Sequence, residues 1–286
     1  MKSYGSACYI EVKMLYFLIR EFQYTNQTID IMKTIHTTML LIVLFVLIPF
    51  NQHAQNTNES QAYWVHEDPI YPSKVSDFEE YSSSLVENCK KYNIKQANWF
   101  TISTNDLKYF SISPIENMAD LDKSRFSLLR DEMGETEFNE LFNKFDNCYD
   151  AHTDYIIHLD KALSYAPNGN ITPQDGMEYR RMQFYYSTPQ NFQKVLEVAK
   201  KFKELYVKEK SQESYRLYRS GFGAPGQFII VAISAKSSED YERIFKINQS
   251  LLGEQRDPLF DELMKNIIKV ETLDGYMRAD LSYNPN

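Results

Sequence analysis

The sequence predicts an α+β protein made of two βαββαβ repeats, packed sheet to sheet as a barrel within one chain. The first supporting observation is a duplicated motif. Phe138–Leu141 leads to the run Leu163–Pro167, and the similar Phe260–Leu263 leads to Leu281–Pro285. The second is that the expected strands and helices follow the same order in both halves. A motif that recurs with its surrounding elements indicates internal duplication.

Aromatic residues repeat at matched spacings as well. Two pairs of distances agree between the halves: Phe78 to Tyr92 with Phe192 to Tyr206, and Tyr109 to Phe126 with Phe228 to Phe245. The alternative is a chance similarity of two α+β halves. We expect residues 62–165 and 179–283 to be two copies with one strand order.

The first repeat, residues 62–165, follows from local patterns. Pro72-Ser73 starts a helix whose apolar residues fall at helical spacing, and Gly134 breaks a second helical stretch. A tight turn at 104–106 joins two short alternating strands. The predicted order is strand Ala62–Glu67, helix Pro72–Tyr92, strands Asn98–Ser103 and Leu107–Ser113, helices Asn117–Met133 and Glu135–Phe145, and strand Tyr155–Leu159.

The second repeat, residues 179–283, follows a Pro-, Gly- and Asn-rich linker at 166–178. Thr188-Pro189 is typical of a helix start, with Thr188 as N-cap. The glycine-rich stretch 221–226 joins two strands and therefore reads as a hairpin turn. The predicted order is strand Tyr179–Tyr186, a helix to Tyr206, strands Tyr215–Arg219 and Phe228–Ser234, helices Ser237–Leu251 and Pro258–Val270, and strand Tyr276–Tyr283.

Composition indicates a folded chain and argues against two classes of partner. The 286 residues are 43% hydrophobic and 14% aromatic, with a formal net charge of -8. Such an acidic chain lacks the basic surface of a nucleic-acid binder, and it has no polybasic stretch for a membrane surface. We therefore expect no nucleic-acid partner. The many Tyr and Phe residues fit a sheet-rich core, or an aromatic-lined pocket.

The N-terminal part predicts export. Lys33 precedes an apolar run, Met39–Phe50, that is too short to span a bilayer comfortably and fits a secretory signal. We interpret 32–54 as a signal peptide cleaved after Ala54, and 1–31 as a doubtful upstream extension. The expected location is periplasmic or secreted, without membrane attachment after cleavage. An uncleaved anchor is the alternative.

Cysteine and histidine spacing predicts no metal site. The chain contains no CxxC and no zinc-ligand spacing. In an exported chain Cys89 and Cys148 could form a disulfide. If their helices run antiparallel, however, the two thiols lie at opposite ends of the domain, so we expect them to stay apart.

Two βαββαβ units in one chain resemble the dimeric α/β-barrel superfamily, whose ferredoxin-like units pack sheet to sheet. Its members include antibiotic-biosynthesis-monooxygenase-like, NIPSNAP-like, stress-responsive and chlorite-dismutase-like proteins. The resemblance covers about 62–283 and rests on element order and repetition. It implies a tandem ferredoxin-like barrel. The Asn-Trp-His set of haem-degrading members has no counterpart that the sequence identifies, and no histidine is evident as a proximal haem ligand.

The predicted site is the face of the strands opposite the helices. If helix-packed faces are apolar, Met277, Ala279 and Leu281 point outward, and polar residues on alternate positions point into the barrel. Aligning the Leu-Ser-Tyr endings places His158 opposite Tyr276. The predicted ligand-binding set is Arg181, Arg216, Arg278, Tyr185, Tyr218, Tyr276, His158, Asp160, His66 and Trp64. The alternative is an ion-pair network that only fixes how the halves pack.

The expected function is binding of a small aromatic or anionic molecule between the two repeats of an exported protein. One alternative is a cofactor-independent oxygenase-like or haem-related enzyme. Another is a structural or protein-binding envelope protein without catalysis. The sequence identifies no cofactor and leaves the oligomeric state open. An open space between the sheets favours ligand binding, and a packed one favours the structural alternative.

Overall fold

The structure is a computed structural model that describes residues 60–172 and 175–285. The proposed extension at 1–31 and the proposed signal peptide at 32–54 lie outside these residues. Among the helices of the described part, none is long and apolar enough to cross a membrane.

Eight strands form one closed barrel in the order β1-β3-β2-β8-β5-β7-β6-β4. Closure leaves no unpaired sheet edge. This confirms the predicted α+β class and the barrel of two packed repeats. The strands are β1 Ser60–Pro69, β2 Trp99–Thr104, β3 Lys108–Ile115, β4 Thr153–Tyr165, β5 Tyr179–Ser187, β6 Tyr215–Ser220, β7 Gln227–Ala235 and β8 Ile267–Tyr283.

The two halves share one strand order. The first reads β4-β1-β3-β2 and the second β8-β5-β7-β6, so corresponding strands occupy corresponding places. Antiparallel pairs β2–β8 and β4–β6 join the two four-stranded sheets at both edges. The predicted common strand order is therefore confirmed.

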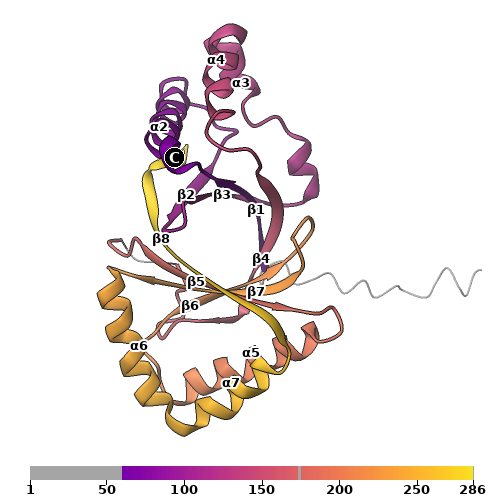
Figure 1. The fold of residues 1–286 in the computed structure, drawn as a ribbon, viewed down its shortest axis with the longest axis vertical. Coiled ribbons are helices and arrows are strands. Elements are labelled where there is room, and N and C mark those ends of the chain that lie inside the picture. The colour runs from indigo at the N-terminus through magenta and orange to yellow at the C-terminus, as the bar shows by residue number, and fades with distance from the viewer. Residues whose placement is uncertain (1–59, 173–174, 286) are drawn as a thin grey trace, which may run out of the picture. The chain divides into compact units, whose positions relative to one another are not determined.

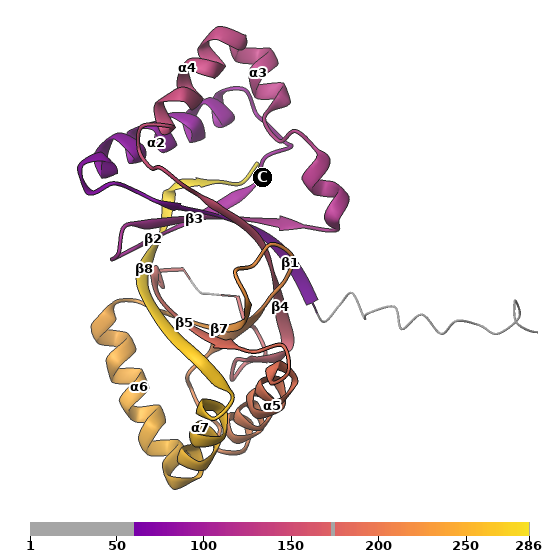
Figure 2. The same ribbon diagram turned by 45° about the vertical axis from the view of Figure 1, so that its right-hand side comes forward.

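Helices cover the outer face of each sheet. In Figures 1 and 2, α2, α3 and α4 lie over the first sheet and α5, α6 and α7 lie over the second, with the barrel between them. The helical segments are η1 Pro72–Lys74, α2 Val75–Lys91, η2 Met118–Asp122, α3 Ser127–Met133, α4 Glu135–Phe145, α5 Phe192–Lys208, α6 Ser238–Leu252, η3 Gly253–Gln255 and α7 Arg256–Met264.

Two predicted helices are shorter than expected. The stretch 117–133 splits into η2 and α3, and α7 ends at Met264, so 267–270 belong to a strand. Those residues pair with Tyr185–Ser187 of β5. Long-range pairing thus overrides the local helical pattern. Figure 2 shows the resulting β8 running along both halves of the barrel.

Gly275 marks the place where β8 passes from one repeat to the other. It pairs with Arg180 of β5 and with Thr104 of β2. A Cβ at this position would lie 2.2 Å from the backbone oxygen of Ser103. Only glycine lets the two backbones approach so closely.

The cores beneath the helices differ between the halves. In the second half, residues under α5, α6 and α7 form one continuous cluster that includes Val195, Leu217 and Tyr241. In the first half, the corresponding residues form two separate clusters, one around Trp99 and one around Phe78. Cys89 belongs to the first of these clusters and Cys148 to the second, and both are buried free thiols.

Candidate functional site

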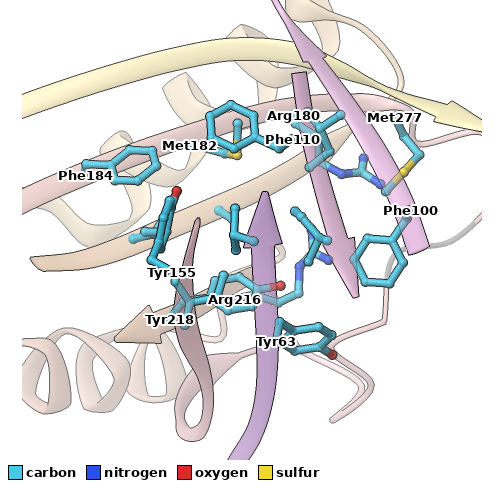
Figure 3. Close-up of a pocket in the computed structure, with 16 residues that line it drawn as sticks. Tyr63, Phe100, Phe110, Tyr155, Arg180, Met182, Phe184, Arg216, Tyr218 and Met277 are labelled. Atoms are coloured by element: carbon cyan, nitrogen blue, oxygen red, sulfur yellow. The ribbon is translucent and has the colours of Figure 1, made fainter. Parts of the chain in front are cut away.

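The barrel interior is nearly filled by side chains. Its remaining cavity measures about 50 Å³. That is room for a few waters, far below the ~300 Å³ of a small ligand pocket. Figure 3 shows aromatic and aliphatic side chains occupying this space, among them Phe100, Phe110, Phe184 and Tyr155. The central space is therefore too small for a ligand. A second hollow between the repeats, which Glu67, Lys108 and Glu271 help to line, measures about 230 Å³ and is also below that range. This part of the molecule fits the structural alternative better than a ligand site.

The residues of β5 that we expected to face the barrel interior face outward, toward the helices. Arg180, Met182 and Phe184 line the interior, whereas Tyr185 packs in the core beneath the helices. Arg181 also points outward, with its Nε 2.7 Å from Asp274 and its Nη2 3.7 Å from Glu242 of α6. The prediction assumed a polar interior. Most of the interior is instead apolar, because it is a second packed core, although Arg180 and Arg216 also line it.

On β8, Met277 lines the interior instead of Arg278. The Arg278 guanidinium binds Asp280 at 2.7 Å and also Glu79 of α2, on the outer face. Tyr276 is 43% exposed and contacts the ring of Tyr179. The predicted convergence of three arginines on one interior face is therefore wrong for Arg181 and Arg278.

His158 and Asp160 also face outward. His158 pairs with Ala62 and Arg219 across the sheet. Burial and then the charge of Arg219 lower the pKa of His158. Asp160 lies 3.1 Å from Nε of Arg219, and it accepts a hydrogen bond from the backbone of Leu163. These contacts hold the β4–β6 junction of the two repeats.

Arg216 and Tyr218 do line the interior, together with Arg180, which the sequence prediction missed. Arg216 donates to Ser234 Oγ at 2.8 Å, and Arg180 donates to the Tyr179 carbonyl at 3.0 Å. Burial, and then repulsion from Arg216, lower the pKa of Arg180 to about 10. Among the described residues, neither arginine has a carboxylate at ion-pair distance.

The larger cavity lies between the first sheet and its helices. We call it the helix-side cavity, and its volume is about 470 Å³. It lies between the two core clusters of the first half, taking Trp99 from one and Phe78 from the other. Its lining comprises Trp64, His66, Asp68, Phe78, Ser82, Leu85, Trp99, Thr101, Ser111, Ser113, Leu121, Lys123, Arg125, Phe126, Phe142, Asn143, Phe145, Asp146, Tyr149 and Leu281.

Trp64 and His66 meet in this cavity, on the outer face of β1. The guanidinium of Arg125 lies over the Trp64 ring, 3.8 Å from its centroid, and donates to Ser113 Oγ at 2.6 Å. Burial lowers the pKa of Arg125 to about 10. The group is charged at neutral pH, and no carboxylate of the described residues lies within ion-pair distance.

Carboxylates surround His66. Its Nδ1 lies 2.9 Å from Asp154 Oδ1 and its Nε2 3.1 Å from Asp68 Oδ1. Trp64 Nε1 donates to the same Asp154 oxygen at 2.8 Å. Burial opposes the charged imidazole, but the two carboxylates outweigh it and raise the pKa of His66 to about 9.

Sequence reasoning missed Asp68, Arg125, His152 and Asp154. Three of them carry a readable signal, since His66-x-Asp68 and His152-x-Asp154 each place a histidine and a carboxylate on one face of a strand. Arg125 lies in the segment between η2 and α3, where no helical or strand periodicity predicts which way its side chain points.

Comparison with known proteins identifies the fold. Neither family models nor curated sequences match the chain. An anthrone oxidase-like protein of known structure is 12% identical with a TM-score of 0.54, covering 78% of this chain and 93% of its own.

Two further structures are less similar. A monooxygenase-like protein of Lactobacillus acidophilus is 9% identical, with a TM-score of 0.47 and coverage of 77% of this chain and 94% of its own. A mutant chlorite dismutase from Candidatus Nitrospira defluvii is 8% identical, with a TM-score of 0.44 and coverage of 77% and 92%. The similarity to the anthrone oxidase-like structure concerns the fold, an α/β barrel that this chain closes with eight strands.

Proposed function

We propose that the protein binds a small molecule with an aromatic body and an anionic end in the helix-side cavity. This places the ligand beneath the helices of the first repeat instead of between the repeats. The observation that carries the proposal is the contrast between the halves, one hollow beneath its helices and the other packed.

The difference in packing between the two halves implies a free-energy cost for the first half. Protein interiors are close-packed, and an unfilled cavity costs roughly 24 cal/mol per Å³ of residual volume. The second half shows that this fold can pack the same interface as one cluster. The cavity of about 470 Å³ in the first half falls within the range of small-ligand pockets. Its retention supports a role in binding.

The lining indicates the chemistry of the ligand. Phe78, Phe126, Phe142 and Phe145 supply aromatic surface. The indole N–H of Trp99 and the hydroxyl of Thr101 are not available to a ligand, because both donate to the carbonyl of Leu281. Arg125 is a half-buried cation of this lining with no carboxylate of the described residues at ion-pair distance, and its planar fork suits a carboxylate ligand.

Naphthoate is a suitable probe, because it joins two fused aromatic rings to a carboxylate. Both tryptophans of the chain, Trp64 and Trp99, line the cavity, so their fluorescence reports its occupancy. We expect saturable quenching with a dissociation constant on the order of 100 µM. Arg125→Ala should weaken binding by roughly tenfold or more, the effect of losing a charged hydrogen bond.

Arg181→Ala is the matched control. Arg181 also lies on an outer sheet face over an aromatic ring, 4.6 Å from the Tyr241 centroid, but in the packed second half. Its loss should leave naphthoate binding unchanged. Equal effects of the two substitutions, or no saturable binding in the parent protein, would contradict the proposal.

We also propose that the protein is exported. The basis is Lys33 followed by the apolar run 39–50. Sequencing the N-terminus of protein recovered from separated cell fractions should give a start near Gln55 in the extracytoplasmic fraction. Protein in the cytosol with Met1 intact would refute this.

An oxygenase-like enzyme is the second candidate. The support for this candidate is the fold that the chain shares with an anthrone oxidase-like protein, to which it is 12% identical. Oxygen uptake with electron-rich aromatic substrates would support it, and a haem-induced Soret band would support the haem-related form. Binding of naphthoate without either signal would favour a binding protein.

A further inference from the structure

We infer that His66, Asp68 and His152 form a binding site for a divalent transition-metal ion such as Zn²⁺ at the edge of the helix-side cavity. One potential ligand atom of each residue lies within 4.8 Å of those of the other two. Two imidazoles and one carboxylate are a common ligand set for zinc and related ions, with an open position left for water.

The strand register brings the three residues together. His66 pairs with Asp154 across β1 and β4, and Glu67 pairs with Thr153. Asp68 therefore falls opposite His152, one step past the last pair. Because side chains alternate along a strand, all four His and Asp side chains lie on the outer face. The two imidazole rings are 4.9 Å apart, centroid to centroid.

Asp68 gives an independent indication of a ligand. It is 5% exposed, and its Oδ1 accepts no hydrogen bond from the described residues. His66 Nε2 is 3.1 Å from this oxygen but not aligned to donate to it. Among the described residues this buried oxygen has the imidazole beside it but no aligned hydrogen-bond donor, and a cation between the oxygen and the imidazole would satisfy both.

The distances fit coordination with a small adjustment. Ligand atoms bound at ~2.0–2.2 Å around a tetrahedral ion lie roughly 3.4 Å apart. The separation of 3.1 Å between His66 and Asp68 is near this value. The ligand atom of His152 lies within 4.8 Å of the other two, so a shift of roughly 1 Å brings it to that spacing. Its half-exposed side chain, just before β4, permits this shift.

Asp154 would orient the metal-binding histidines. Its Oδ1 lies 2.9 Å from His66 Nδ1, which leaves Nε2 for the ion. Its Oδ2 lies 3.6 Å from His152 Nε2. Carboxylates commonly hold ligating histidines in this way. Because His66 and Asp68 line the helix-side cavity, the open coordination position faces the place proposed for the small molecule.

Zinc binding by tag-free, chelator-treated protein tests the inference without any small molecule, so it can fail separately from the proposed function. Titration calorimetry at mildly alkaline pH should show one Zn²⁺ per chain, and Co²⁺ should give the visible absorption of a low-coordinate site. His152→Ala should lower the affinity by roughly 100-fold and Asp154→Ala by roughly tenfold or more.

His158→Ala is the matched control, because His158 lies on β4 with Asp154 but outside the cluster. Its affinity should equal that of the parent protein, and circular dichroism should show that all variants are folded. Absence of Zn²⁺ binding by the parent, or equal affinity of the parent and His152→Ala, would overturn the inference.

Discussion

The guanidinium of Arg125 stacks on the indole of Trp64, 3.8 Å from the ring centroid, while its Nη1 donates to Ser113 at 2.6 Å. Trp64 is in turn held by Asp154 through its Nε1. The stack thus fixes a cation at the wall of the helix-side cavity. A planar guanidinium can satisfy both contacts at once, and an ammonium cannot.

Arg125→Lys should therefore bind naphthoate less well than the parent but better than Arg125→Ala. The charge is kept, whereas the stacking and the fixed direction are lost. We expect a decrease of about threefold to tenfold, in line with a partly buried cation–π contact. Tryptophan quenching measures it, and a Lys variant as weak as the Ala variant would show that charge is not what the site uses.

Two leucines test the difference in packing between the halves. Leu281 borders the helix-side cavity and Leu217 lies in the packed cluster, and both are at most 2% exposed. Leu217→Ala should cost about 4 kcal/mol of unfolding free energy, and Leu281→Ala about 2–3 kcal/mol because fewer contacts are lost beside an existing cavity. Urea unfolding gives both values. A larger loss at Leu281 would argue that the first half is packed in solution.

Gly275→Ala should destabilise the junction of the repeats by about 3 kcal/mol. The reason is the 2.2 Å approach of the added Cβ to the Ser103 backbone oxygen, which no side-chain rotation relieves. Gly169→Ala is the control, with positive φ but open space around it, and should cost about 1 kcal/mol. Similar urea midpoints for the two variants would refute the close crossing.

The Glu79–Arg278 contact should contribute to acid sensitivity. The hydrogen bond from Arg278 lowers the pKa of Glu79, although burial opposes the shift. The hydroxyl of Tyr109, 2.5 Å away, also lowers this pKa, and nearby Asp280 raises it. A lowered folded-state pKa gives stability that is present above the unfolded-state pKa and lost as pH falls through the folded-state value.

Glu79→Gln should therefore be less stable than the parent at neutral pH and approach it in acid. Unfolding midpoints measured at neutral and acidic pH give the comparison. A difference that does not shrink in acid would show that the loss comes from packing and not from the charge.

The fold could be predicted because short sequence patterns recur in the same order in both halves of the chain. The Leu-Ser-Tyr endings and the matched aromatic spacings fix the element order, which the strand order 4-1-3-2 of each half confirms. The bounds of β8 could not be predicted, since 267–270 become a strand by pairing with β5.

The site could be predicted only in part. Trp64 and His66 line one cavity as two members of the predicted set. On β5, and on β8 around Met277 and Arg278, the predicted and observed faces are reversed, because the barrel interior is itself an apolar core. Leu281 lies beneath the helices, as predicted. Arg181 and Arg278 occupy polar rims under the helices, with Asp274 and Glu79 as partners. Hydropathy alternation alone cannot distinguish a helix-covered face from a barrel interior that is also packed.

The most direct test of the central claim is a crystal structure of the protein with a brominated naphthoate, in which bromine gives an anomalous signal. We expect a single strong peak in the helix-side cavity, with the carboxylate within hydrogen-bond distance of Arg125. A peak in the barrel interior beside Arg180 and Arg216, or an empty helix-side cavity at saturating ligand, would contradict it.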